Sequence, residues 1–247
     1  MDRMLYVAMS GAKQTMLAQT ANSHNLANAN TNGFRADLAA FHSMPVYGQG
    51  APTRVYAMTE SAGVDTTSGA INPTGRELDI AIKGEGWIAV QAPDGSEAYT
   101  RVGNLRVTDG GILRTGSGLP VLGNGGPVAL PPAEKIEIGG DGTVSIRGVG
   151  QAASTLTVLD RIKLVRIDGG SLMKGEDGLL RKRDGSPATP DASVSVVSGA
   201  LETSNVNTVE AMVNLISLAR QYETQVKMMK TAEDIDTAAT QLLNISG

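Results

Sequence analysis

The chain has 247 residues, a formal net charge of -4 and an aromatic content of 3%. This length accommodates one large domain or two smaller ones, and the acidic balance argues against a nucleic-acid surface, which needs clustered Lys and Arg. Cysteine is absent, which excludes disulfides, thiolate metal sites and a cysteine nucleophile. Because His24 and His42 are the only histidines, the chain is poor in metal ligands, and we predict no metal site and no cofactor.

The two ends of the chain differ from its middle in glycine and proline content. All ten prolines lie between Pro45 and Pro190, residues 201–246 contain neither glycine nor proline, and residues 1–32 contain only Gly11. We therefore predict an α+β fold, in which long N- and C-terminal helices pair as a coiled-coil layer and a central all-β domain is inserted between them. The predicted domains are a terminal helical domain of residues 1–35 and 200–247, a partly extended connector of residues 36–72, and a central β domain of residues 73–199.

The N-terminal segment shows a helical repeat of apolar residues. The repeat has steps of four, three and four residues and resumes after two polar positions, and its members are Leu5, Met9, Ala12, Met16 and Leu26. Gly33 suits the position just after a helix end, so we predict that this helix stops there. Several asparagines precede Gly33, although asparagine side chains compete for backbone hydrogen bonds inside helices. They indicate either a capped helix end or a contact with neighbouring chains.

Short alternating segments and turn residues dominate the region from residue 73 to residue 199. Leu78–Ile82 alternates with period two, and the apolar segment Trp87–Val90 follows a glycine-rich turn. Asp-Gly pairs, which are typical of tight turns, recur along the whole region. We predict strands at residues 78–82, 87–90, 99–101, 105–107, 112–114, 121–122, 136–138, 144–146, 156–159, 163–167 and 194–197, and one strand in the connector at residues 54–59.

The C-terminal segment carries the clearest helical periodicity of the chain. Asn207 followed by Glu210 is a variant of the capping box, so we predict that the helix begins there. A helix of about 40 residues would be about 60 Å long, and it needs a partner to cover its apolar stripe. The stripe comprises Met212, Leu215, Ala219, Tyr222, Val226, Met229, Ile235 and Leu242, with a phase slip near Ala232.

No motif in the chain points to catalysis. Ser10 to Lys13 fits the S-x-x-K pattern of penicillin-recognising enzymes, but the accompanying motifs are missing. The glycines around Glu85 lack the third glycine of a phosphate-binding loop. The N-terminus lacks a basic region followed by a continuous apolar core, and no apolar run reaches the length of a membrane span. We predict a chain that is not an enzyme, has no signal peptide of the Sec type, does not insert into membranes, and has no nucleic-acid or small-molecule partner.

Both ends of the chain resemble signatures of the flagellar axial protein family, whose members form the rod and the hook. The N-terminal signature comprises Ala8–Ala12 and Asn25–Arg35, which contains Asn-Leu-Ala-Asn, then Thr31, Gly33, Phe34 and Arg35. The C-terminal signature comprises Glu202–Asn207, Met212–Ile216, Arg220–Glu223 and Lys230–Glu233. In the centre, Leu78–Trp87 and Tyr99–Leu105 are also similar to rod and hook sequences. The resemblance covers nearly the whole chain and is strongest to proximal-rod members, with distal-rod paralogues as the alternative.

The resemblance implies a structural role. Members of the family are exported by the flagellar type III apparatus without a cleaved signal, and they polymerise into a hollow tube. The chain would be a subunit of the proximal rod, the part of the flagellar basal body that crosses the periplasm and transmits torque from motor to hook. Its partners would be other copies of itself, neighbouring proximal-rod and distal-rod subunits, and the export apparatus.

The resemblance also implies that the terminal helices form a layer between subunits. We expect the intersubunit seam to contain Leu5, Met9, Ala12, Met16, Leu26, Met212, Leu215, Ala219, Tyr222, Val226, Met229, Ile235 and Leu242. Asn25, Asn28 and Asn205 are candidates for polar contacts between subunits, and helix capping is an equal alternative for them.

Two alternatives from other classes of function stay open. A secreted hydrolase would hide a carboxylate pair in the β domain, and a pocket with converging acids would reveal it. A binding module carried on an intramolecular coiled coil would instead be a stable, helical monomer.

Overall fold

The computed structural model describes residues 4–45, 55–151, 156–175 and 177–245. The chain forms two compact units. The first, which we call the helical unit, comprises Met1–Ala27, Asp37–Ala62 and Asn207–Gly247, and the second, the β unit, comprises Asn28–Ala36 and Gly63–Val206. The predicted α+β class, with a helix near each end and an all-β region between them, is confirmed. The predicted domain boundaries stay a prediction.

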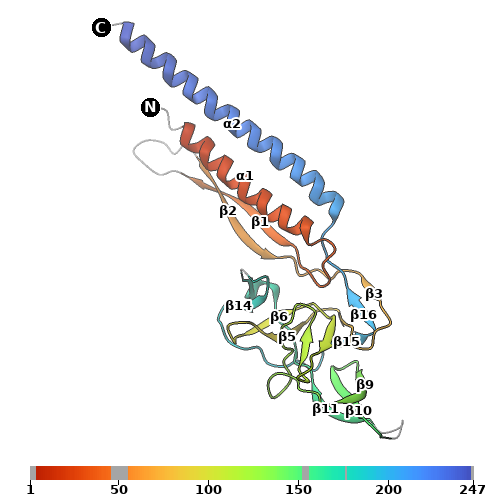
Figure 1. Cartoon of the computed structure of the whole chain (residues 1–247). Coiled ribbons are helices and arrows are strands. Elements are labelled where there is room, and N and C mark those ends of the chain that lie inside the picture. Colours follow the sequence, from red (N-terminus) through yellow and green to blue (C-terminus); the bar gives the residue numbers. More distant parts are fainter. Residues whose placement is uncertain (1–3, 46–54, 152–155, 176, 246–247) are drawn as a thin grey trace. The chain divides into compact units, whose positions relative to one another are not determined.

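Two helices build most of the helical unit. Helix α1 spans Met4–Ala27 and helix α2 spans Thr208–Ile245, and the two lie side by side along the length of α1 (Figure 1). They run antiparallel, because Gly11 faces Gln225 while the Asn22 side-chain amide donates to the Ala211 carbonyl at 2.7 Å. Both helices are rich in Ala, Leu, Met and Gln, which favour helix strongly.

The helix ends confirm one prediction and correct another. Asn207 caps α2 as predicted, because its side-chain oxygen accepts from the backbone N–H groups of Val209 and Glu210 at 3.1 and 3.3 Å. Helix α1 was predicted to reach Gly33 but ends at Ala27. Turns follow it, with the Thr31 N–H donating to the carbonyl of Asn28. Asparagine offers the backbone local alternatives to the helical hydrogen bonds, which explains the early end.

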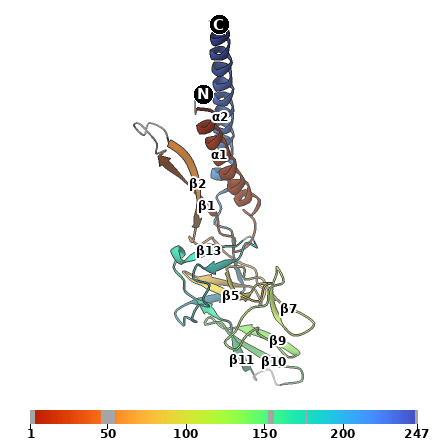
Figure 2. The same cartoon turned by 90° about the vertical axis from the view of Figure 1, so that its left-hand side faces the viewer.

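A two-stranded sheet completes the helical unit. Strand β1 spans Asp37–Pro45 and strand β2 spans Val55–Val64, and the pair runs alongside α1 (Figure 2). The Ser10 hydroxyl donates to the carbonyl of Ala57 at 3.0 Å. The predicted strand in the connector therefore exists as part of β2, whereas β1 lacks the alternation of apolar and polar residues that would have revealed it.

Short antiparallel strands build the β unit. A five-stranded sheet has the order β12-β5-β6-β14-β13, a three-stranded sheet the order β11-β10-β9, and three two-stranded sheets pair β15 with β4, β16 with β3 and β7 with β8. The strands are β3 Ile71–Pro73, β4 Ile80–Lys83, β5 Trp87–Gln91, β6 Glu97–Thr100, β7 Leu105–Val107, β8 Leu113–Thr115, β9 Ala133–Ile138, β10 Thr143–Gly148, β11 Thr157–Arg161, β12 Leu164–Val165, β13 Leu172–Lys174, β14 Leu180–Lys182, β15 Ser195–Ser198 and β16 Ala200–Glu202. A short 3₁₀ helix, Gly169–Ser171, precedes β13.

Most predicted strands coincide with these elements. The exception is the predicted strand at residues 121–122, which forms isolated bridges instead. Strands β3, β13, β14 and β16 have three residues each and were missed, because so short a segment rarely shows enough alternation to be recognised.

Strand β5 of the five-stranded sheet is buried on both faces, which explains its continuous apolar run. Ile88 and Val90 contribute to one core cluster, while Trp87 and Ala89 contribute to a second one. Successive side chains of a strand point to opposite faces, so these two pairs belong to the two sides of the sheet. Trp87, the single tryptophan of the chain, is only 2% exposed.

Candidate functional site

Small residues form the contact of α1 with α2. The buried residues of α1 follow a helical repeat of three to four residues, in which Gly11 and Ala12 are adjacent, and are Ala8, Gly11, Ala12, Thr15 and Ala18. A Cβ added to Gly11 would lie 2.9 Å from the side-chain Cδ of Gln225, so the two helices approach closely there. The sequence-based seam followed the large apolar residues instead and shares only Ala12 with this buried stripe.

The predicted seam residues lie mostly on the outside of the helix pair. The large side chains are exposed at 42% for Leu5, 54% for Met9, 60% for Met16, 54% for Met212, 39% for Tyr222, 41% for Val226 and 54% for Ile235. Leu26, Leu215, Ala219 and Met229 are half-buried, and Ala12 is buried. The side chain of Leu242 lies outside the described part of the chain. The intersubunit role of these residues stays a prediction.

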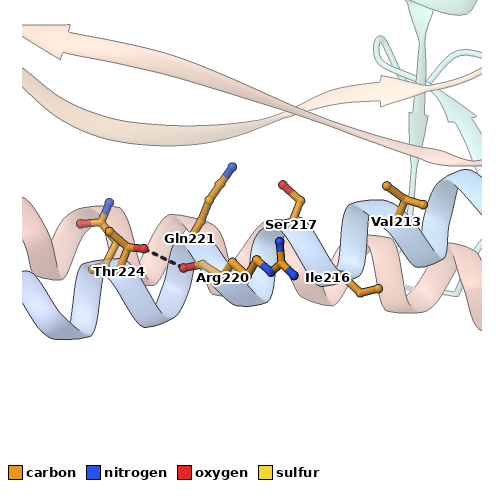
Figure 3. Close-up of a pocket in the computed structure, with 7 residues that line it drawn as sticks. Val213, Ile216, Ser217, Arg220, Gln221 and Thr224 are labelled. Carbon is orange, nitrogen blue, oxygen red and sulfur yellow. Dashed lines mark hydrogen bonds between the residues drawn. The ribbon is translucent and has the colours of Figure 1, made fainter.

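Further apolar side chains extend this exposed surface. On α1 they are Tyr6 and Leu17, and on the first turns of α2 they are Val209, Val213 and Ile216. A shallow groove of about 500 Å³ follows this part of α2, and Val213, Ser217 and Gln221 point to the same side of the helix there (Figure 3). Among the 24 residues of α1, Lys13 is the only Asp, Glu, Lys or Arg. Helix α1 is thus apolar on the face that contacts α2 and on the face that does not.

A buried carboxylate in the β unit was not anticipated from the sequence. Glu202, at the end of β16, is 1% exposed, and the two arginines that bind it are each 3% exposed. Its Oε1 accepts from Arg35 Nη2 at 2.6 Å and from the Gly69 N–H at 2.9 Å, and its Oε2 accepts from Arg101 Nη1 at 2.9 Å. The guanidinium carbons of Arg101 and Arg35 lie 5.0 and 5.9 Å from the ring centroid of Trp87. Charge-assisted bonds of this kind are stronger than neutral ones.

The electrostatics of this cluster reflect burial. Burial lowers the pKa of Arg101, while the negative charge of Glu202 opposes that shift. A guanidinium nevertheless keeps its charge in proteins. Two buried cations therefore share one buried anion, and Arg101 also donates to the carbonyl of Gly84 at 2.8 Å.

Asn205 ties the same region together through its side chain. Its Oδ1 accepts from the Ala36 N–H at 2.9 Å, and its Nδ2 donates to the carbonyls of Asp65 and Thr67 at 3.1 and 3.2 Å. The Gly33 N–H donates to the Glu202 carbonyl at 2.8 Å. We call residues 33–36, 65–70 and 202–205, together with Arg101, the Glu202 junction.

The other candidate asparagines also bond within the chain. Asn25 exchanges two hydrogen bonds with the backbone of Asp37, at 2.8 and 2.9 Å, and Asn28 accepts from the Thr31 hydroxyl at 3.1 Å. For Asn25, Asn28 and Asn205 alike, a polar contact between subunits stays a prediction.

Gly33 explains why the N-terminal signature carries a glycine. Its φ is +69°. This backbone conformation is unfavourable for every residue that has a Cβ atom, but not for glycine. A Cβ there would also lie 2.4 Å from the backbone carbonyl carbon of Arg101. Both terminal signatures and the central segment Tyr99–Leu105 contribute residues to the Glu202 junction, and the other central segment, Leu78–Trp87, contacts it because Gly84 and Trp87 lie against Arg101.

The acidic side chains that line a cavity of the β unit are engaged by other groups of the chain. A cavity of about 550 Å³ in the β unit is lined by the acids Glu85 and Asp168. However, Glu85 is paired with Arg166, and Asp168 accepts from the Gly170 N–H. Among the residues that the structure describes, no three His, Asp or Glu side chains gather as metal ligands would. In the same residues, no helix combines the length and apolar character that crossing a membrane requires.

Three family models match the chain in succession. The description "Flagella basal body rod protein" matches residues 5–35, "Flagellar hook protein FlgE/F/G D1 domain" matches residues 81–146, and "Flagellar basal body rod FlgEFG protein C-terminal" matches residues 197–242. The flagellar basal-body rod protein FlgF of Escherichia coli K12 is 42% identical, with both chains covered completely. The chain belongs to the FlgF family of flagellar basal-body rod proteins. No enzymatic activity is implied by this membership.

Other relatives agree with this assignment. The FlgF protein of Rhizobium meliloti is 35% identical over 93% of this chain and 92% of its own length. The FlgG protein of Buchnera aphidicola from Acyrthosiphon pisum is 30% identical over 96% of this chain and 98% of its own length. The FlgG relative, which represents the distal-rod alternative, is thus less similar to this chain than the two FlgF relatives named above.

Proposed function

We propose that this chain is a structural subunit of the proximal flagellar rod and that its two helices pack against neighbouring subunits. The observation that carries the proposal is the second apolar face of α1, which the chain itself leaves exposed. Leu5, Met9 and Met16 on that face are between 42% and 60% exposed. Full burial of a large apolar side chain is worth roughly 1.5–3 kcal/mol.

Helix α1 supports the proposal through its composition. A helix that is apolar on all sides is normally buried on all sides, and contiguous apolar surface on a soluble protein marks an interaction site. Within the chain, α1 contacts α2 and the β1–β2 pair, and the residues that it buries are the small ones. The face with Leu5, Met9 and Met16 stays exposed and needs a cover from another subunit, and the apolar first turns of α2 on a neighbour are suited to it.

The length of α2 supports the proposal independently. Helix α1 has 24 residues and α2 has 38, so their lengths are about 36 and 57 Å at 1.5 Å per residue. Residues 233–241 of α2 are all exposed. Ile235 in this stretch is 54% exposed, so this end of α2 also offers apolar surface to a partner.

The partners that fit are other copies of this chain and the neighbouring rod proteins. In this proposal the assembled tube crosses the periplasm, and the type III apparatus exports the chain without a cleaved signal. The assembled rod transmits torque from the motor to the hook. The family's printed names support the basal-body location and the rod role.

Met16→Glu tests the proposal in a strain that lacks its own copy of the gene. The substitution places a charge on the exposed face of α1, so the melting temperature of the purified chain should stay unchanged while rods and motility are lost. Met173→Glu, the same substitution at a 47% exposed side chain of the β unit, is the matched control and should assemble. Normal motility with Met16→Glu would contradict the proposal and favour a binding module carried on an intramolecular helix pair.

Asn28→Ala tests a polar contact between subunits separately. Lost rod assembly with unchanged export would support the contact, and wild-type motility would exclude it.

A further inference from the structure

We infer that the Glu202 junction is the clamp through which the β unit resists mechanical load in the assembled rod, with Glu202 and Asn205 as its positioning residues. The inference rests on the proposed function and adds to it a place where torque enters the β unit. Its starting point is the path of the chain. The chain passes from one unit to the other after Ala27, Ala36, Ala62 and Val206.

Each passage lies next to a segment of the junction. Residues 28–36 belong to the β unit between the first two passages, the segment after the third begins at Gly63, and residues 202–206 precede the fourth. Force that travels along the chain from the helices enters the β unit through these three covalent segments. If they were free to move separately, the force would bend or pull each of them in turn.

The junction prevents separate movement of the three segments. The carboxylate of Glu202, on the third segment, accepts from Arg35 on the first and from Gly69 on the second. The side chain of Asn205 repeats this pattern and binds Ala36 on the first and Thr67 on the second. One carboxylate and one amide thus each join all three segments.

Hydrogen bonds between backbone groups also join the three segments. The Asp65 N–H donates to the Ala36 carbonyl at 2.9 Å, which joins the first and second segments directly. The Thr203 N–H donates to the Ala70 carbonyl at 2.8 Å, which joins the second and third. The third segment continues from strand β16, which pairs with β3 (Figure 1). No segment can be displaced without breaking bonds to both others.

The clamp is also anchored in the core of the β unit. Arg101, which binds Glu202, donates to the carbonyl of Gly84 and lies against the ring of Trp87. Hydrogen bonds between buried ions are electrostatically strong and are little screened by salt. Because these bonds act together, the junction should fail only when several of them break at once.

Asn205→Ala tests the clamp without removing the buried charges. Thr108→Ala is the matched control, because it removes a half-buried side-chain bond, to the carbonyl of Ile112, elsewhere in the β unit. The wild-type chain and each variant are expressed separately in a strain from which the gene for this protein has been deleted. Rods are counted by electron microscopy of isolated basal bodies, and motor rotation is recorded with a small bead at low load and a large bead at high load.

We expect Asn205→Ala and Thr108→Ala to form rods in equal numbers and to rotate alike at low load. At high load only Asn205→Ala should lose rotation and release hook–filament pieces into the medium. Equal rotation of both variants at high load would overturn the clamp. Loss of rods with Asn205→Ala alone would also overturn it and assign Asn205 to assembly, whereas absence of rods with the wild-type chain would refute the proposed function instead.

A second variant guards against simple unfolding. If the purified Asn205→Ala chain melts below the growth temperature, Asn205→Asp takes its place. Aspartate keeps the oxygen that accepts from Ala36 but loses the amide that donates to Asp65 and Thr67. The same load dependence is expected, and rotation equal to that of Thr108→Ala at high load would again overturn the clamp.

Discussion

Replacing Glu202 with glutamine removes one negative charge from a position that is 1% exposed while it nearly preserves the shape of the side chain. The guanidinium groups of Arg35 and Arg101 would remain buried without their shared anion. Removing one partner of a buried ion pair typically costs about 3–5 kcal/mol, because the remaining charge is left uncompensated. In a unit of this size each kcal/mol corresponds to roughly 2–4 °C, so the melting temperature should fall by roughly 6–20 °C.

Tryptophan fluorescence during thermal unfolding measures this effect directly, because the single tryptophan, Trp87, lies against both guanidinium groups. Glu85→Gln is the matched control. It makes the same chemical change at a side chain that is 77% exposed and paired with an arginine on the surface, where a pair is worth about 0–1 kcal/mol. Equal melting temperatures for Glu202→Gln and Glu85→Gln would refute the reasoning. The difference between them should persist in about 1 M salt, which screens surface pairs but not buried ones.

Three further outcomes are expected. Gly33→Ala should lower the melting temperature of the β unit more than Gly75→Ala, since both glycines have positive φ but only a Cβ at Gly33 would clash, with the backbone of Arg101. Gly11→Leu should separate α1 from α2 and reduce the helical circular dichroism signal at elevated temperature, at a cost of about 1–3 kcal/mol, whereas Gly11→Ala should be tolerated because it meets only a flexible side-chain end. Hydrogen bonds from Arg181 lower the pKa of Asp177 below its ordinary value of 3.8. The stability that the ionised Asp177 carboxylate contributes is therefore present above pH 3.8 and is lost as the pH falls through the lowered pKa. Asp177→Asn should therefore flatten the decline in melting temperature measured from pH 5 to pH 2, and an unchanged decline would contradict this.

Local sequence patterns were sufficient for the elements that depend on local physics. The absence of glycine and proline from residues 201–246 and the Asn207 cap led to α2 with its correct start. Period-two alternation led to most strands of the β unit. The end of α1 was misplaced because the preference of asparagine for local hydrogen bonds outweighed the glycine signal at Gly33.

The contact between α1 and α2 uses a face of α1 that the sequence pattern did not single out. The periodicity of large apolar residues indicated Leu5, Met9 and Met16 for a seam between subunits, which stays a prediction, whereas the residues of α1 that the chain itself buries are small ones such as Ala8, Gly11 and Ala18. Small residues carry little weight in a hydrophobic pattern, although they allow the closest approach of two helices. A repeat of Ala, Gly and Thr at steps of three and four was the signal that could have identified this face.

The sequence by itself determined the class of the fold, the helix and strand periods, the cap of α2 and, through its terminal signatures, the family. These follow from interactions within a few residues or from motifs that are contiguous in the chain. Only the tertiary structure decided which face of α1 is covered and why Glu202 is buried. Arg35 and Arg101 lie 167 and 101 residues from Glu202, and no local pattern encodes a charge pairing that arises when separate segments come together.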